Sequence, residues 1–120
     1  MNTNNLVIRL CVAGARAELE HRPQEARALY QQAWEAHTND YEACIAAHYV
    51  ARFQDSTAES LRWNQIALEH ANAVPDDEVQ DFYPSLYLNL GQAHELLGNQ
   101  TEAQKYYDLA SQLGVSHQPD

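Results

Sequence analysis

Cys44, His48 and His94 are the side chains best suited by type and spacing to hold a metal ion. Cys44 and His48 are four residues apart, so within a helix they project from one face. Thiolate and imidazole are the ligands that zinc prefers, but a complete site needs further ligands, and none can be named. The alternative is that the imidazoles are packed side chains with hydrogen-bond partners. We therefore predict no metal and no cofactor.

Cys11 and Cys44 are the only cysteines, and a redox role for this pair is the next chemistry to consider. In neighbouring helices their α-carbons would be about 8–10 Å apart, a typical helix-packing distance. That separation is too long for a disulfide. We predict two buried, reduced thiols. A phosphate-binding glycine loop and the HExxH, CxxC and GxSxG motifs are also missing, so we predict that the chain is not an enzyme.

The charge of the chain restricts its partners. Its 120 residues carry a formal net charge of −10, and their number fits a single domain. Negative charge opposes binding to nucleic acid and to anionic membrane surfaces. The short apolar run near the N-terminus is interrupted by Arg9 and fits neither a signal peptide nor a transmembrane span. We predict a cytoplasmic protein that binds neither nucleic acid nor membrane.

Apolar periodicity predicts six helices, at about 5–20, 23–37, 41–54, 56–72, 76–97 and from 99 onward. Pro23 fits the first turn of the second helix. Ser56 with Glu59, and Asn99 with Glu102, have the spacing of a capping box. Helices joined by such short connections pack as antiparallel pairs.

A repeated pattern explains why Gly91 lies inside a predicted helix, where glycine costs about 1 kcal/mol relative to alanine. Around it, the pattern W-x2-L-G-x2-Y followed by A-x3-F is matched by Tyr87, Leu90, Gly91, His94, Ala103, Tyr107 and Ala110. The same offsets hold Leu10, Ala13, Gly14, Ala17, Ala26, Tyr30 and Ala33. A third set, which matches poorly by type, holds Cys44, Ala47, His48, Ala51, Ser60, Asn64 and Ala67.

With these three units the chain resembles the tetratricopeptide repeat family, and an unrelated six-helix bundle is the alternative. The resemblance implies an all-α fold in which three antiparallel helix pairs form a right-handed superhelix. Residues 1–120 would be one domain with units at about 7–40, 41–74 and 84–117. An insertion at 75–83 would extend the fifth helix, with a kink or short break at Pro84. At His48, in place of the glycine, we expect a splayed hairpin or an imidazole that leans outward.

The resemblance also implies a function: family members bind proteins or peptides in a concave groove lined by the first helix of each unit. The corresponding residues here are Ile8, Cys11, Ala15, Leu19, Glu42, Ile45, Tyr49, Arg52, Phe53, Ser85, Leu88, Asn89, Gln92 and Glu95. They form an apolar floor with a mostly acidic rim, which suits an amphipathic or basic peptide. The cations with which some family members grip a carboxylate are missing, so we predict no such clamp.

Several alternatives remain at this stage. The groove could instead be covered by the chain's own N-terminus or by a second copy, or it could bind a small peptide signal in a regulatory module. Tyr106, Leu109 and Leu113 lie on the last predicted helix, and only seven residues follow Leu113. Because a repeat array needs a polar terminal face, we expect self-association or a partner at this end.

Overall fold

The computed structural model describes residues 5–75 and 77–113, which form six α-helices and two short 3-10 helices. In chain order the α-helices are α1 (Leu6–Leu19), α2 (Pro23–Ala36), α3 (Asp40–Val50), α4 (Thr57–Ala73), α5 (Tyr83–Leu96) and α6 (Gln100–Gln112). The 3-10 helix η1 (Ala51–Phe53) continues α3, and η2 (Asp77–Phe82) leads into α5. These residues contain no strand, so the all-α prediction is confirmed for them.

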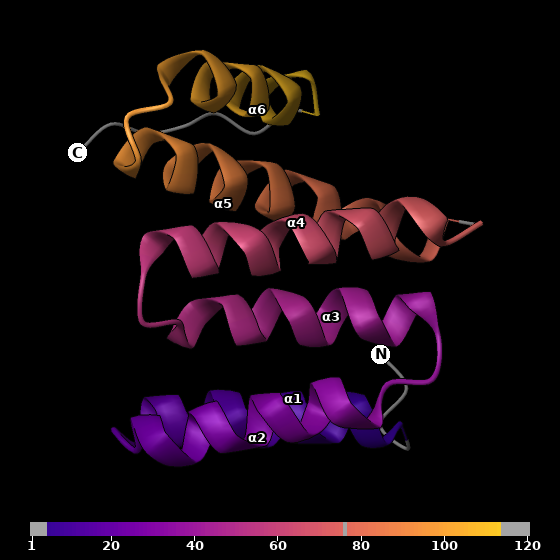
Figure 1. The fold of residues 1–120 in the computed structure, drawn as a ribbon. Coiled ribbons are helices and arrows are strands. Elements are labelled where there is room, and N and C mark those ends of the chain that lie inside the picture. The colour runs from indigo at the N-terminus through magenta and orange to yellow at the C-terminus, as the bar shows by residue number, and fades with distance from the viewer. Residues whose placement is uncertain (1–4, 76, 114–120) are drawn as a thin grey trace.

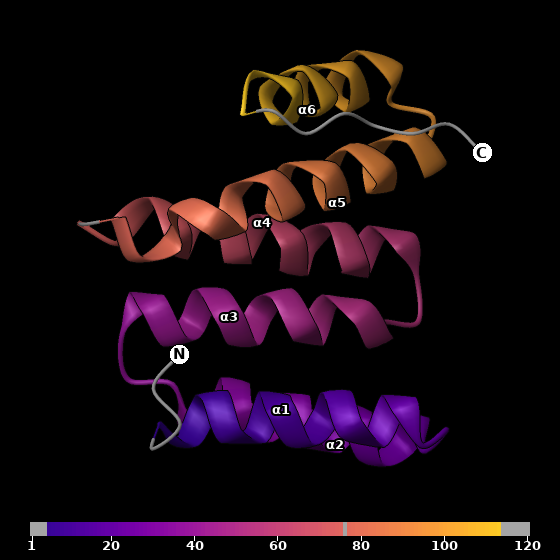
Figure 2. The same ribbon diagram turned by 180° about the vertical axis from the view of Figure 1, so that it is seen from behind.

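The helices lie one above another in chain order, from α1 and α2 at one end to α6 at the other (Figure 1; seen from behind in Figure 2). Each α-helix packs against the next one along the chain, and α1 also contacts α3. The most extensive contacts are within the pairs α1–α2, α3–α4 and α5–α6. Short connections account for this arrangement because they bring successive helices together as hairpins.

Three helices begin at a side-chain cap. Asn5, Asn39 and Ser56 each accept a hydrogen bond from the backbone N–H three residues later, at 3.2, 2.8 and 3.1 Å. Such a bond satisfies one of the backbone N–H groups that the first turn leaves free. Pro23 begins α2, which has no side-chain cap, and the N–H that proline lacks is one that the first turn leaves without a helical partner in any case.

The ends of α1 and α5 share one type of turn. His21 and Gly98 both adopt a positive φ, 61° and 83°. After each, the next backbone N–H reaches back to a carbonyl of the last helical turn, from Arg22 to Ala17 and from Asn99 to His94, both at 2.8 Å. These bonds are typical of a Schellman motif, which reverses the chain after a helix.

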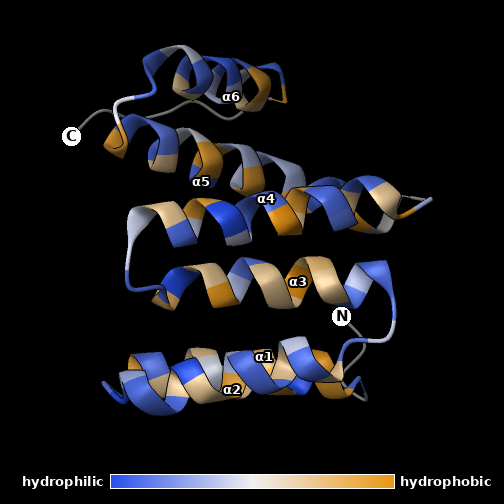
Figure 3. Ribbon diagram, in the orientation of Figure 1, coloured by the Kyte–Doolittle hydropathy of each residue, from blue (hydrophilic) through white to orange (hydrophobic). Residues whose placement is uncertain are grey.

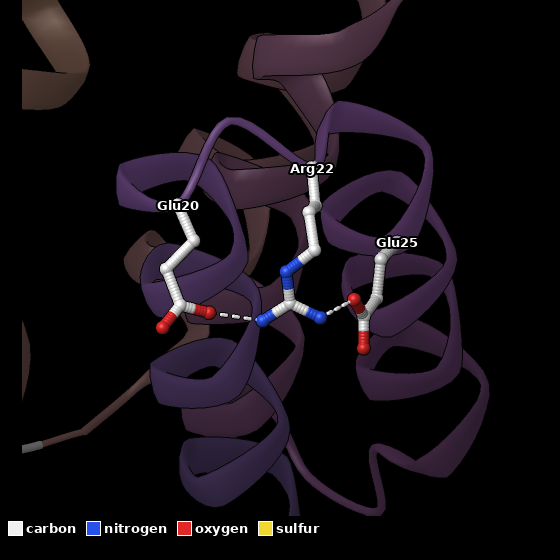
Figure 4. Close-up of polar contacts among 3 residues, drawn as sticks. All are labelled: Glu20, Arg22 and Glu25. Carbon is white, nitrogen blue, oxygen red and sulfur yellow. Dashed lines mark hydrogen bonds and ion pairs between the residues drawn. The ribbon is translucent and has the colours of Figure 1, made fainter.

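The first of these turns carries a group of surface ion pairs. The Arg22 guanidinium contacts the carboxylates of Glu20 and Glu25, one on each side of the turn (Figure 4). All three side chains are about half exposed, so the contacts contribute little to stability. They link the end of α1 to the first turn of α2 through the side chain of Arg22.

Tyrosines from the second helices cover the glycines of the outer hairpins. A Cβ added at Gly91 would lie 2.6 Å from Cε1 of Tyr107. At Gly14 it would lie 2.7 Å from Cδ1 and 2.9 Å from Cζ of Tyr30. Both glycines are therefore required by close packing of the two helices rather than by the backbone conformation.

The middle of the stack is the most apolar part. Ala43, Cys44, Ile45, Ala46 and Ala47 of α3 are all buried, and apolar colours cover much of that helix in Figure 3. Trp34 and Trp63 close this core from α2 and α4, with ring centroids 5.0 Å apart at nearly a right angle. Nowhere in 5–75 or 77–113 is there a helix both long and apolar enough to cross a bilayer.

The segment before α5 differs from the prediction. We expected residues 75–83 to lengthen the fifth α-helix, but residues 77–82 form the separate 3-10 helix η2, and α5 begins at Tyr83. Pro84 lies in the first turn of α5, where its missing N–H is tolerated, and its ring disfavours an α-helical turn just before it. Within η2, Val79 is buried beside Leu86, so the segment is packed against the core.

Candidate functional site

An apolar pocket of about 240 Å³ opens between α1, α3 and the junction of η2 with α5. It is lined by Ile8, Cys11, Val12, Cys44, Ile45, His48, Tyr49, Phe82, Ser85 and Leu86. Three separate parts of the chain form its wall. Their relative positions follow from the contacts of α1 with α3 and of both with the core around Phe82.

The apolar pocket brings together five of the groove residues expected from the sequence: Ile8, Cys11, Ile45, Tyr49 and Ser85. Sequence reasoning missed the other five lining residues, which are Val12, Cys44, His48, Phe82 and Leu86. Phe82 depends on η2, for which the repeat pattern has no counterpart. Val12 remains 49% exposed at the pocket, and the available signal in the sequence was its apolar type directly after the predicted groove residue Cys11.

The other predicted groove residues lie elsewhere. Arg52, Asn89 and Gln92 line a separate polar cavity between α3, α4 and α5. Phe53 packs in the core around Tyr30, with ring centroids 5.8 Å apart. Glu42 is engaged within the chain, accepting hydrogen bonds from Asn5 and Thr38.

The remaining predicted groove residues are distributed over α1 and α5 and line neither space. Leu19 is 82% exposed, whereas Ala15 and Leu88 are half-buried. Glu95 is exposed and accepts a hydrogen bond from the Tyr107 hydroxyl at 3.4 Å. The apolar pocket therefore includes fewer residues than the groove predicted from the repeat pattern.

The titratable side chains of the apolar pocket are neutral near pH 7. Burial raises the pKa of Cys11 from 9.0 to about 12 and that of Cys44 to about 11, so both thiols stay protonated. Burial also raises the pKa of Tyr49. The pKa of His48 is lowered by burial and, to a lesser degree, by the charge of Arg52. An uncharged, apolar space of this kind favours an apolar group.

An ion pair joins the first and second hairpins. Arg52 donates from Nε and Nη2 to the two carboxylate oxygens of Glu18, at 3.1 and 2.7 Å. Tyr30 donates from its hydroxyl to the same carboxylate. Burial raises the pKa of Glu18, but these hydrogen bonds outweigh it and the net shift is downward. The pair therefore fixes η1, through Arg52, against α1, through Glu18, and the two opposite charges neutralise each other.

Cys11 and Cys44 both line the apolar pocket as free, buried thiols. The two histidines have separate surroundings: His94 stacks on Tyr106 and contacts Asn99, whereas His48 contacts Asn89 and Tyr49. In the described part of the chain, no three His, Cys, Asp or Glu side chains lie close enough together to hold a metal ion.

The predicted self-association face lies on α6, the last helix of the stack (Figure 1). Leu113 is 51% exposed, whereas Tyr106 and Leu109 are half-buried. Tyr106 is held by its neighbours, since it stacks on His94 at 5.6 Å and on Tyr87 at 6.2 Å between ring centroids. The residues after Leu113 lie outside the described part of the chain.

Comparison of the chain with protein-family models, with curated proteins and with solved structures gave no match.

Proposed function

We propose that this chain is a tetratricopeptide-like helical repeat protein that binds a peptide segment of a partner protein, without catalysis. The apolar pocket between α1, α3 and α5 carries the proposal. Its size suits an apolar side chain, and the first and third hairpins repeat one arrangement, a glycine covered by a tyrosine ring. A right-handed superhelix of three such pairs would place the pocket on its concave face.

The charge of the chain favours a basic or amphipathic partner. A net charge of −10 attracts a cationic segment over a distance and speeds its association. An apolar side chain of that segment would then enter the uncharged pocket and supply the short-range contact. The exposed Val12 lies where the segment would enter.

Selection of peptides from a displayed random library against the folded protein tests this proposal. Enriched peptides should carry an apolar residue near basic ones, and their affinity is measured by fluorescence anisotropy. Val12→Asp places a charge at the pocket, so we expect it to weaken binding about tenfold or more, because a buried unpaired charge is costly.

Leu6→Asp is the matched control for Val12→Asp. Leu6 is 52% exposed on the same helix but does not line the pocket, so binding should persist. The proposal is wrong if no peptide is enriched, or if both variants bind equally. It is also wrong if Val12→Asp separates a dimer into monomers, because the groove would then hold a second copy.

Self-association through α6 is a second, independent proposal. The exposed Leu113, directly after α6 at the end of the stack, supports it, together with the half-buried Leu109 on α6. We expect light scattering at micromolar concentration to show an oligomer that Leu113→Glu dissociates. A strict monomer would rule it out.

A further inference from the structure

The middle hairpin exchanges the large and small residues of the outer two. In the outer hairpins a tyrosine ring covers a glycine, Tyr30 over Gly14 and Tyr107 over Gly91. At the corresponding positions of the α3–α4 hairpin, His48 replaces the glycine and Asn64 replaces the tyrosine. The hairpin closes normally, since α3 and α4 pack together and the small Asn64 leaves space opposite the imidazole.

The missing ring leaves a polar cavity of about 220 Å³ between α3, α4 and α5. Both exchanged residues line it. Hydroxyl and amide groups are added by Ser60, Asn89 and Gln92. Leu96 of α5 also lines the cavity and is mostly exposed. The space is several times what a single water requires.

Asn64 has an unused hydrogen-bond acceptor. Its side chain is buried, with the residue only 4% exposed, and Nδ2 donates to the Ser60 carbonyl at 3.0 Å. Its Oδ1 is buried without a partner. Because unsatisfied buried polar atoms are rare and destabilising, this oxygen indicates that a donor from outside the chain completes the cavity.

The other lining groups indicate the chemistry of that donor. No carboxylate is among the described lining residues, so a cation would find no counter-charge in the cavity. The Arg52 guanidinium is already paired with Glu18, and an anion would face the Asn64 oxygen. A neutral group with both N–H donors and a carbonyl fits the amides of Asn89 and Gln92 as well as Asn64.

The polar cavity adjoins the apolar pocket, since His48 lines both. We propose that the polar cavity binds the carboxamide of an asparagine or glutamine side chain, supplied by the same peptide whose apolar side chain fills the apolar pocket. This inference rests on the proposed peptide-binding function. The Asn64 oxygen accepts from the amide of the ligand, and the amides of Asn89 and Gln92 pair with its carbonyl and remaining N–H.

NMR titration of the labelled protein with acetamide, acetate and methylammonium tests the cavity directly. We expect acetamide alone to give saturable shifts, at the side-chain amides of Asn64, Asn89 and Gln92. Asn64→Leu keeps the number and branching of the side-chain heavy atoms but removes the acceptor, and it should abolish these shifts. The control Gln65→Leu, at an exposed position of α4, should preserve them.

Three results would overturn the inference. The first is no saturable shift with any probe, which would mean that water alone satisfies Asn64. The others are equal shifts with acetate or methylammonium, and acetamide binding that Asn64→Leu leaves unchanged. If Asn64→Leu fails to fold, Gln92→Leu at an exposed position of α5 tests the same site and should weaken acetamide binding.

Selected peptides separate this inference from the function on which it rests. Replacing their Asn or Gln residues by Leu or Glu should weaken binding about tenfold. Peptides that bind through the apolar pocket without any such preference would leave the proposed function standing and refute the carboxamide site. Acetamide binding without any peptide ligand would support a carboxamide cavity and refute the peptide-binding function.

Discussion

Gly14→Ala is the sharpest test of how the hairpins pack. An alanine in a helix is normally about 1 kcal/mol better than glycine, so an unconstrained position would be stabilised. Here the new methyl group would lie 2.7–2.9 Å from two atoms of the Tyr30 ring and closer still to Cε1, well inside the usual carbon contact of about 3.5–4.0 Å. Either the ring or the helix must move.

The Tyr30 ring has little freedom to move. It is 1% exposed, stacks on Tyr49 at 4.9 Å, lies beside Phe53, and donates its hydroxyl to Glu18. Overpacking of such a core costs about 1–3 kcal/mol, and three close atoms place this case near the upper end. After the gain in helix propensity, we expect a net loss of about 2 kcal/mol.

Urea unfolding followed by circular dichroism measures this loss, which corresponds to a fall in Tm of roughly 5–10 °C for a domain of this size. In a Tyr30→Leu background the clash is relieved, so Gly14→Ala should become neutral or stabilising, and a double-mutant cycle isolates the coupling. If Gly14→Ala stabilises the unaltered protein by about 1 kcal/mol, the close-packing argument is refuted.

Three further outcomes are expected. His21→Gly should stabilise the folded state by up to about 1 kcal/mol, because His21 has a positive φ that glycine adopts without strain, and thermal melting would measure it. The free energy of unfolding should fall as the pH rises from about 9 toward 12, because burial raises the pKa of Cys11 in the folded state and the unfolded chain loses the thiol proton first. Cys11→Ala should reduce this fall in a plot of stability against pH. At the acid end, Glu18 has a lower pKa in the folded state than its ordinary value of 4.5, so its ionised form stabilises the folded state above pH 4.5. This stability is lost as the pH falls through the folded-state pKa. Glu18→Gln should remove that loss when the stability is measured at decreasing pH. An acid profile unchanged by Glu18→Gln would show that the Arg52 pair contributes nothing to it.

The helices could be predicted from the sequence because their signals are local. Ser56 and the proline at position 23 mark where helices begin, and each lies at a helix start in the structure. The capping box predicted at Asn99 was wrong, since Asn99 precedes α6 but makes no side-chain cap, and its amide contacts His94 instead. The spacing of Gly14 from Tyr30 is also visible in the sequence, since a close contact between the two helices of a hairpin recurs at a constant offset.

What sequence reasoning missed depends on contacts between distant residues. Phe82 reaches the apolar pocket only because η2 is a 3-10 helix packed by Val79, and no repeat pattern describes that segment. Arg52 and Glu42 were assigned to a free rim, but each is engaged by another side chain of the same chain. Comparing each position separately with the repeat pattern also made the second unit look like a poor match. His48 and Asn64 are complementary as a pair, because a larger residue replaces the glycine and a smaller one replaces the tyrosine.

That complementarity makes positions 48 and 64 epistatic. Asn64→Tyr alone would drive a ring against the His48 side chain, as a methyl group on Gly91 would meet Tyr107. His48→Gly alone would enlarge the cavity and weaken the helix. Only the two changes together give the hairpin the arrangement of its neighbours, and they would fill the cavity. A lineage descending from a uniform repeat would therefore have had to cross a less stable intermediate to open this space between its helices.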